Sequence, residues 1–163
     1  MEGTTANQYL TFTLEGEQYA IGVAKVREVL EHTKITKLPK TAEYMKGIIN
    51  LRGTGVPVID LRLKFGMPET PVTKDTSIIV MEVEGPEGPV VVGALADAVH
   101  EVVEIEAGSV EPAPKFGTRL ATEFIRGVGK RDEGFVILLD IDRIFNSEDM
   151  EVLRAAEPAA AGV

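Results

Sequence analysis

The feature that most constrains how this chain can fold is an internal repeat. Segments of the first half align, in order, with segments of the second half, and the offset between them grows only where the second half has longer turns. The matched segments are 10–14 with 79–83, 26–29 with 99–102, Pro39 with Pro112, 44–48 with 124–128, and Asp60, Leu61 and Phe65 with Asp140, Ile141 and Phe145. Such a repeat predicts two similar units. We therefore expect a single domain over residues 1–163, made of two pseudo-repeated halves at about 8–70 and 75–146.

Short strands account for most of the apolar pattern. Residues 8–14 alternate between apolar and polar side chains, as a half-buried strand does. The other predicted strands are 18–22, 35–38, 78–83, 90–95, 99–105, 124–128 and 135–141, and the last is so apolar that we expect both of its faces to be buried. Halves of about 70 residues would be marginally stable alone, so they should share an apolar core. About five short strands in each half predict an all-β fold of two small barrels.

Helical signals are few and local. Residues 23–30 predict a helical turn that runs on into extended chain, and 63–66 and 141–145 predict single helical turns. Residues 147–156 have the pattern of an amphipathic C-terminal helix with Ser147 as its N-cap, and it could pack on either half. Residues 68–74 and 112–122 are expected to be irregular connections.

A hairpin with a glycine-bearing turn is predicted over residues 44–65. Its two apolar runs flank Gly53 and Gly55, which permit the backbone of a tight turn. Pro57 cannot donate a ladder hydrogen bond, so its strand should lie at a sheet edge or bend there. Arg52 lies in the turn among small residues, and its guanidinium is therefore a candidate contact for a partner protein.

Charge and composition narrow the classes of function. The chain has 26 acidic and 17 basic residues and a net charge of −9, which disfavours nucleic acid and anionic membranes as main partners. There is no cysteine, so neither a disulfide framework nor a thiolate metal site is expected. The longest apolar run, 90–96, is too short to cross a bilayer, and the first residues lack a signal-peptide pattern. We expect a soluble, cytoplasmic protein.

Catalytic and metal-binding motifs are not evident. Asp60 and Asp140 could be compared with a carboxylate dyad, but each precedes a helical turn, where an aspartate commonly caps the helix. A calcium loop starting at Asp140 would need an oxygen ligand and a glycine where Ile144 and Phe145 stand. We therefore expect no enzyme activity and no cofactor or metal. A small ligand-binding barrel or an unrecognised hydrolase would instead require a pocket with converging polar groups.

Motifs along nearly the whole chain are similar to one family. Residues 50–53 read Asn-Leu-Arg-Gly and 56–62 read Val-Pro-Val-Ile-Asp-Leu-Arg, and this pair resembles the signature of CheW, the coupling protein of chemotaxis. The further segments that fit the family are 26–29, 35–39, 92–93, 99–102, 111–114, 124–128 and 138–140. Each segment is a weak signal alone, but their order and spacing together are specific.

The resemblance implies two five-stranded SH3-like β-barrels with short helices. It also implies a non-enzymatic adaptor that binds the regulatory domain of the histidine kinase CheA and the cytoplasmic tip of methyl-accepting chemoreceptors. Ring assembly with kinase domains and recruitment to receptor arrays at the inner face of the membrane would follow. A detached regulatory domain of a kinase, or the adaptor half of a receiver fusion, is the alternative within the same fold.

The resemblance also nominates protein-binding residues. Arg52 is the first, because a guanidinium can make a forked, charge-assisted hydrogen bond at an interface. The other candidates are Glu28 and Val26 on one strand, Lys46, Gly47 and Leu51 beside the signature, Val102 in a groove between the halves, and Val152 and Leu153 on the last helix. Gly55 departs from the family pattern, which has a branched apolar residue there. A contact that lacks such a side chain forgoes roughly 1.5–3 kcal/mol of burial.

Overall fold

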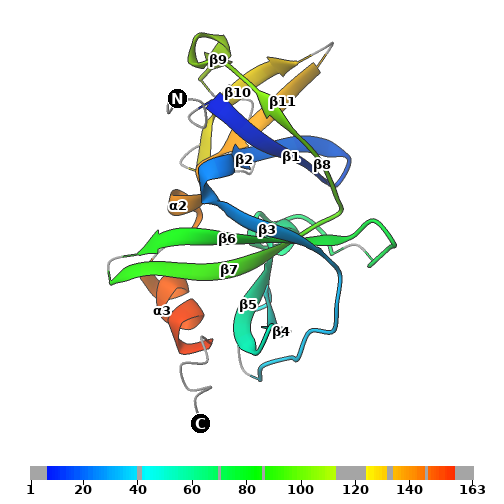
Figure 1. Ribbon diagram of the computed structural model, residues 1–163, viewed down its shortest axis with the longest axis vertical. Helices are drawn as coiled ribbons and strands as arrows, with labels where there is room; N and C mark the ends of the chain where they lie inside the picture. Colours follow the sequence, from blue (N-terminus) through cyan, green and yellow to red (C-terminus); the bar gives the residue numbers. More distant parts are fainter. Residues whose placement is uncertain are drawn as a thin grey trace.

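Two β-sheets and a few short helices make up the computed structural model (Figure 1). The structure describes residues 7–39, 42–69, 71–85, 87–112, 124–131, 134–145 and 147–156. The strands are β1 (Gln8–Leu14), β2 (Glu17–Gly22), β3 (Val26–Glu31), β4 (Met45–Leu51), β5 (Thr54–Asp60), β6 (Ser77–Gly85), β7 (Gly88–Ala96), β8 (Ala98–Glu104), β9 (Val110–Glu111), β10 (Ile125–Arg131) and β11 (Gly134–Leu139). The helices are η2 (Val23–Lys25), α1 (Leu61–Lys64), η3 (Ala107–Ser109), α2 (Ile141–Ile144) and α3 (Ser147–Ala156). The predicted all-β class with short helices is confirmed.

Each sheet combines strands from both repeats. One sheet has the order β8-β1-β2-β11-β10-β9 and the other the order β3-β6-β7-β5-β4. The hairpin β1–β2 of the first repeat thus pairs with strands of the second, and the hairpin β6–β7 of the second pairs with strands of the first (Figure 1). Both sheets curl, in agreement with two barrels, although the first has six strands because the short strand β9 adds to its edge. The segments 8–70 and 75–146 therefore mark the repeat in the sequence, but neither segment forms a sheet by itself, because each contributes one hairpin to the sheet of the other.

The strand registers reproduce the sequence repeat. Phe12 of β1 pairs with Val99 of β8, and Met81 of β6 pairs with Val26 of β3. These two pairs are equivalent, because Phe12 aligns with Met81 and Val26 aligns with Val99 in the repeat. The bulges repeat as well, since the register shifts at equivalent places in β4 and β10. The repeat is therefore a duplication of the pairing pattern and not only of composition.

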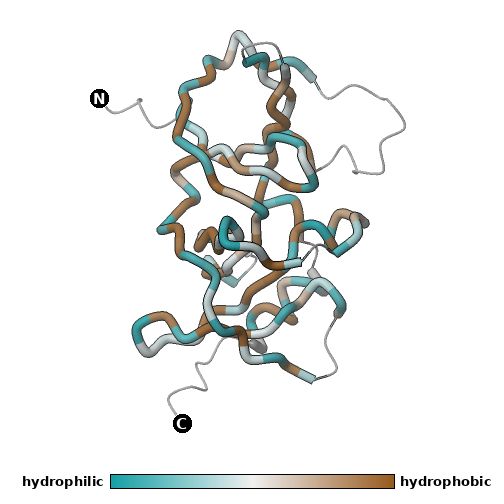
Figure 2. The backbone as a smooth tube through the Cα atoms, turned by 90° about the vertical axis from the view of Figure 1, so that its right-hand side faces the viewer, coloured by the Kyte–Doolittle hydropathy of each residue, from teal (hydrophilic) through white to brown (hydrophobic). Residues whose placement is uncertain are grey.

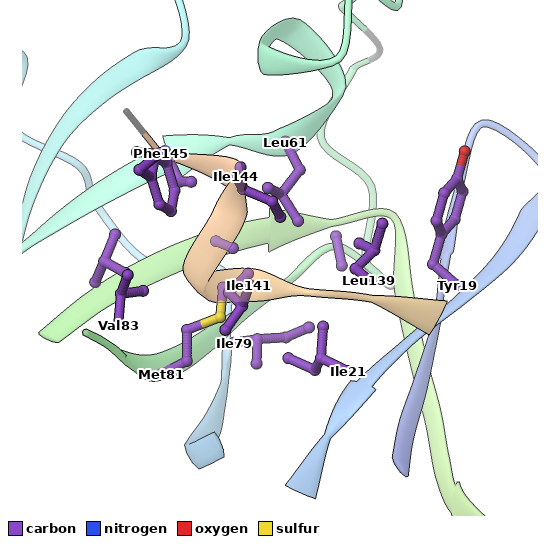
Figure 3. Packing of buried hydrophobic residues seen from close by; sticks show 14 of the residues in the cluster. Tyr19, Ile21, Leu61, Ile79, Met81, Val83, Leu139, Ile141, Ile144 and Phe145 are labelled. Carbon is purple, nitrogen blue, oxygen red and sulfur yellow. The ribbon is translucent and has the colours of Figure 1, made fainter. Parts of the chain in front are cut away.

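Buried apolar side chains form three clusters. The largest contains residues of both sheets and of α2 and α3, and it forms the shared core that the small size of the halves requires (Figure 3). A second cluster around Tyr9, Val136 and Leu138 lies within the six-stranded sheet, and a third around Ile49 and Val58 lies within the five-stranded sheet. Figure 2 shows hydrophobic and hydrophilic segments interspersed along the backbone. Burial alternates along β3 and along most of β4, whereas β1, β5 and β7 have runs of consecutive buried residues because both of their faces are covered.

Three local expectations need correction. Strand β5, which contains Pro57, is internal, between β7 and β4. The ladder with β7 covers only Val58 to Asp60, so the proline lies just before it. Residues 35–38 form a single bridge, Thr36 with Ile48, instead of a strand. In β11, Phe135 is 60% exposed, and the first two residues of this strand are not buried.

Helix α3 packs against the five-stranded sheet and anchors the end of the described chain. Met150 and Leu153 are buried in the shared core. Asp149 accepts hydrogen bonds from the hydroxyl of Tyr44 and from Nζ of Lys64, the latter at 2.6 Å. Ser147, expected as the N-cap, is instead the first residue of the helix.

Candidate functional site

The turn between β4 and β5 has a backbone geometry that few sequences allow. Arg52 has φ 52° and Gly53 has φ 88°, so both central residues are in the left-handed region, as in the type I′ turns of two-residue hairpins. Oδ1 of Asn50 accepts a hydrogen bond from the Gly53 amide at 2.7 Å. Glycine meets the requirement for positive φ without strain, and the Asn50 side chain stabilises the turn. The arginine is therefore presented on a defined backbone and not on a loose loop.

Arg52 forms an ion pair with Glu28, the second predicted contact residue. Nη1 lies 3.3 Å from Oε1 and Nη2 lies 2.5 Å from Oε2, which is a forked contact. The Arg52 side chain is 70% exposed and that of Glu28 is 29% exposed. The hydrogen bond from Arg52 lowers the pKa of the Glu28 carboxyl below its usual value. A residue of β3 and a residue of the β4–β5 turn thus form one charged surface feature.

The remaining candidates near the signature have structural contacts. Lys46 is half-buried, and its Nζ lies 2.6 Å from the carboxylate of Glu69. Gly47 is buried with φ 143°, and a Cβ atom there would lie 2.0 Å from the carbonyl oxygen of Thr36. Leu51 packs against the apolar cluster of the five-stranded sheet. Gly47 is therefore required by close backbone packing in a strand and is not a turn residue.

The valines of β3 and β8 are arranged differently from the expectation. Val26 is half-buried against the shared core, at one of the half-buried positions of the alternating strand β3. Val29 is instead the exposed apolar residue of β3, at 41%, and Val102 of β8 is 52% exposed. Val29 and Val102 occupy equivalent positions in the repeat, because segment 26–29 aligns with 99–102. This equivalence was the signal that could have nominated Val29 from the sequence.

The two candidates on α3 are mainly packing residues. Leu153 is fully buried in the shared core, and Val152 is half-buried against it. Leu153 therefore offers no surface to a partner while α3 stays in place. The apolar face of the amphipathic helix α3 packs on the five-stranded sheet of the same chain.

The six-stranded sheet carries a second arginine–glutamate pair. Nη2 of Arg131 lies 3.0 Å from Oε2 of Glu101. Glu101 is the repeat equivalent of Glu28, and Arg131 directly precedes the position equivalent to Arg52. The Arg131 side chain is 32% exposed, less than half the exposure of Arg52. The Arg131–Glu101 pair can therefore serve as a control when the Arg52–Glu28 pair is tested by mutation.

Other kinds of site have little support in the described part of the chain. No group of three or more histidine, aspartate or glutamate side chains there could hold a metal ion. Asp60 and Asp140 do not form a dyad, since Asp60 is buried and binds Arg62, while Asp140 pairs with Arg143 at 3.5 Å. Among the described residues, no helix has both the length and the apolar character that a membrane crossing requires.

A duplicated β scaffold that displays an exposed, ion-paired arginine on a tight turn has the features of a protein-interaction module. Comparison with known proteins gives the family. Residues 8–149 match the model of the CheW-like domain, and the chain belongs to this family.

Relatives and a solved structure agree with this assignment. The chain is 37% identical to the chemotaxis protein CheW of Klebsiella aerogenes over 92% of this chain and 88% of the relative. It is 29% identical to the chemotaxis protein CheW of Bacillus subtilis, with 90% and 92% covered. The crystal structure of the scaffolding protein TtCheW from Thermoanaerobacter tengcongensis matches with a TM-score of 0.77 and 37% identity, over 88% of this chain and 90% of that one.

Proposed function

We propose that this chain is a non-enzymatic adaptor that couples chemoreceptors to the histidine kinase CheA. Its relatives are chemotaxis proteins, and the structure it resembles is a scaffolding protein. The observation that carries the proposal is the Arg52–Glu28 pair on the rigid β4–β5 turn. The partners would be the regulatory domain of the kinase and the cytoplasmic tip of a receptor, in arrays at the inner face of the membrane.

The arginine keeps hydrogen-bonding capacity for a partner. A guanidinium has five N–H donors, and the two contacts with Glu28 use two of them. The pairing with Glu28 fixes the orientation of the side chain, so less conformational entropy is lost when a partner binds. Arginine is among the residues enriched where binding energy concentrates in interfaces, so an exposed, oriented guanidinium is a suitable contact for a partner.

The test is a charge reversal with a matched control. Arg52→Asp places two carboxylates together and removes the donors, and we expect binding of a purified kinase regulatory domain or receptor fragment to weaken about tenfold or more. Arg131→Asp makes the same change in the Arg131–Glu101 pair of the other sheet, and we expect a smaller effect. Calorimetry measures affinity, circular dichroism verifies the fold, and kinase activity in mixtures with receptor fragments measures coupling.

Two results would refute the proposal. Unchanged affinity for both partners in folded Arg52→Asp would remove the role of the pair. No binding of wild-type protein to either fragment, with no effect on kinase activity, would remove the adaptor function itself.

A further inference from the structure

A cavity of about 260 Å³ opens where the six-stranded sheet meets α2. Its lining includes Lys25, Arg126, Asp140 and Asp142. Cavities for drug-sized ligands are usually about 300–1,000 Å³, so this one suits a single side chain better than a metabolite. The cavity is separate from the candidate interface residues, since none of them is part of its lining.

The internal repeat shows what fills the equivalent place in the first half. Asp60 is the equivalent of Asp140, and both backbones are held alike: the Asp60 amide donates to Tyr44 and the Asp140 amide donates to Phe124, at 2.7 and 2.9 Å. In the first half, Arg62 binds Asp60 through two contacts, Nε to Oδ1 at 2.9 Å and Nη2 to Oδ2 at 2.8 Å. The guanidinium is buried there, and it fills the space beside the aspartate.

The second half has the aspartate without a buried arginine among the described residues. Asp142 occupies the position equivalent to Arg62 and is already engaged, since Oδ1 accepts the Glu84 amide at 2.9 Å and Oδ2 lies 2.8 Å from Nζ of Lys25. Within the described chain, the side chain of Asp140 has a 3.5 Å contact with Nε of Arg143, which is 67% exposed. It also makes no capping hydrogen bond to α2, whereas Asp60 caps α1. The carboxylate of Asp140 is therefore held more weakly than that of its repeat equivalent.

We propose that this cavity receives an arginine side chain of a partner protein, whose guanidinium would bind Asp140 as Arg62 binds Asp60. The planar fork of arginine matches both carboxylate oxygens, which the single ammonium of lysine cannot do. Arg126, which also lines the cavity, would repel an inserted arginine unless the partner supplies a negative charge next to it. Its repeat equivalent, Lys46, pairs with Glu69, so we expect an acidic residue beside the inserted arginine. The inference concerns a different surface from Arg52 and holds whichever protein supplies the arginine.

The experiment uses the full chain and a small probe. N-acetyl-arginine amide carries the guanidinium without a free carboxylate, and it is titrated into ¹⁵N-labelled protein at low salt. We expect amide signals of residues 22–25 and 139–142 to shift, with weaker shifts for N-acetyl-lysine amide and none for N-acetyl-citrulline amide, which is uncharged. Asp140→Asn keeps the shape of the site and should weaken binding about tenfold, the scale of one lost charge-assisted contact. Asp75→Asn, an exposed aspartate outside the cavity, is the matched control and should bind as the wild type does.

A second variant tests the comparison between the halves. Asp142→Arg puts an arginine at the position of Arg62, and we expect it to bind Asp140 from within the chain and abolish probe binding. The inference is overturned if the arginine and citrulline probes shift the same signals equally, if Asp140→Asn binds as tightly as the wild type, or if Asp142→Arg folds and still binds the probe. Preferential binding of N-acetyl-aspartate amide would also overturn it, since Lys25 and Arg126 would then make the cavity an anion site.

Discussion

Substitution of Arg62 by methionine tests how the buried ion pair contributes to stability. Arg62 is 2% exposed and Asp60 is fully buried. The Arg62 side chain donates from Nε and Nη2 to Asp60 and from Nη1, at 2.7 Å, to Asp97. Methionine is similar in length but has no charge, so Arg62→Met leaves the Asp60 carboxylate buried without its cation. Removal of one partner from a buried pair costs about 3–5 kcal/mol, which is a large fraction of a typical unfolding free energy of about 5–15 kcal/mol.

The measurement is urea denaturation followed by circular dichroism, with the free energy of unfolding obtained by linear extrapolation. The double variant Asp60→Asn with Arg62→Met removes both charges, and the asparagine can still accept the hydrogen bond from the amide of residue 62. We expect the double variant to regain about 2 kcal/mol relative to Arg62→Met, because the main cost lies in the unpaired charge and not in lost attraction. A loss below about 1 kcal/mol in Arg62→Met, or a double variant no more stable than the single one, would refute this reasoning.

Two further predictions concern the backbone and the aromatic core. Gly47→Ala should lower the free energy of unfolding by about 3 kcal/mol or more in the same urea assay, because the added Cβ would collide with Thr36. Gly16 also has positive φ but has open space around it, so Gly16→Ala should cost only about 1–2 kcal/mol. Burial raises the pKa of Tyr19 to about 12, so the unfolded chain loses this proton first and stability should fall as pH rises from 10 towards 12. Absorbance at 295 nm should show a late phase of tyrosine ionisation that is missing in Tyr19→Phe; an identical titration of the two proteins would contradict the assignment.

The candidate site was only partly predictable from the sequence. Arg52 could be nominated because turn chemistry is local: Asn50 and Gly53 specify the tight turn, and a residue between them must be presented at the surface. Its pairing with Glu28 could not be predicted, since that contact depends on how β3 lies relative to the β4–β5 turn. Val26 was nominated by the family resemblance, whereas burial alternates along β3 and leaves Val29 as its exposed apolar residue.

The sequence by itself determined most of the strands, their turns and the duplication, because apolar runs and turn residues act over a few neighbours and the repeat copies them. Only the tertiary structure decided that the hairpins β1–β2 and β6–β7 exchange sheets, since strand pairing between distant segments is set by the core that both repeats share. It also decided that Asp60 and Asp140, alike in the sequence pattern, have different partners. In the first half, the buried carboxylate of Asp60 is paired with Arg62, two residues later. In the second half, Asp142 stands at the position of Arg62, and a cavity remains beside Asp140.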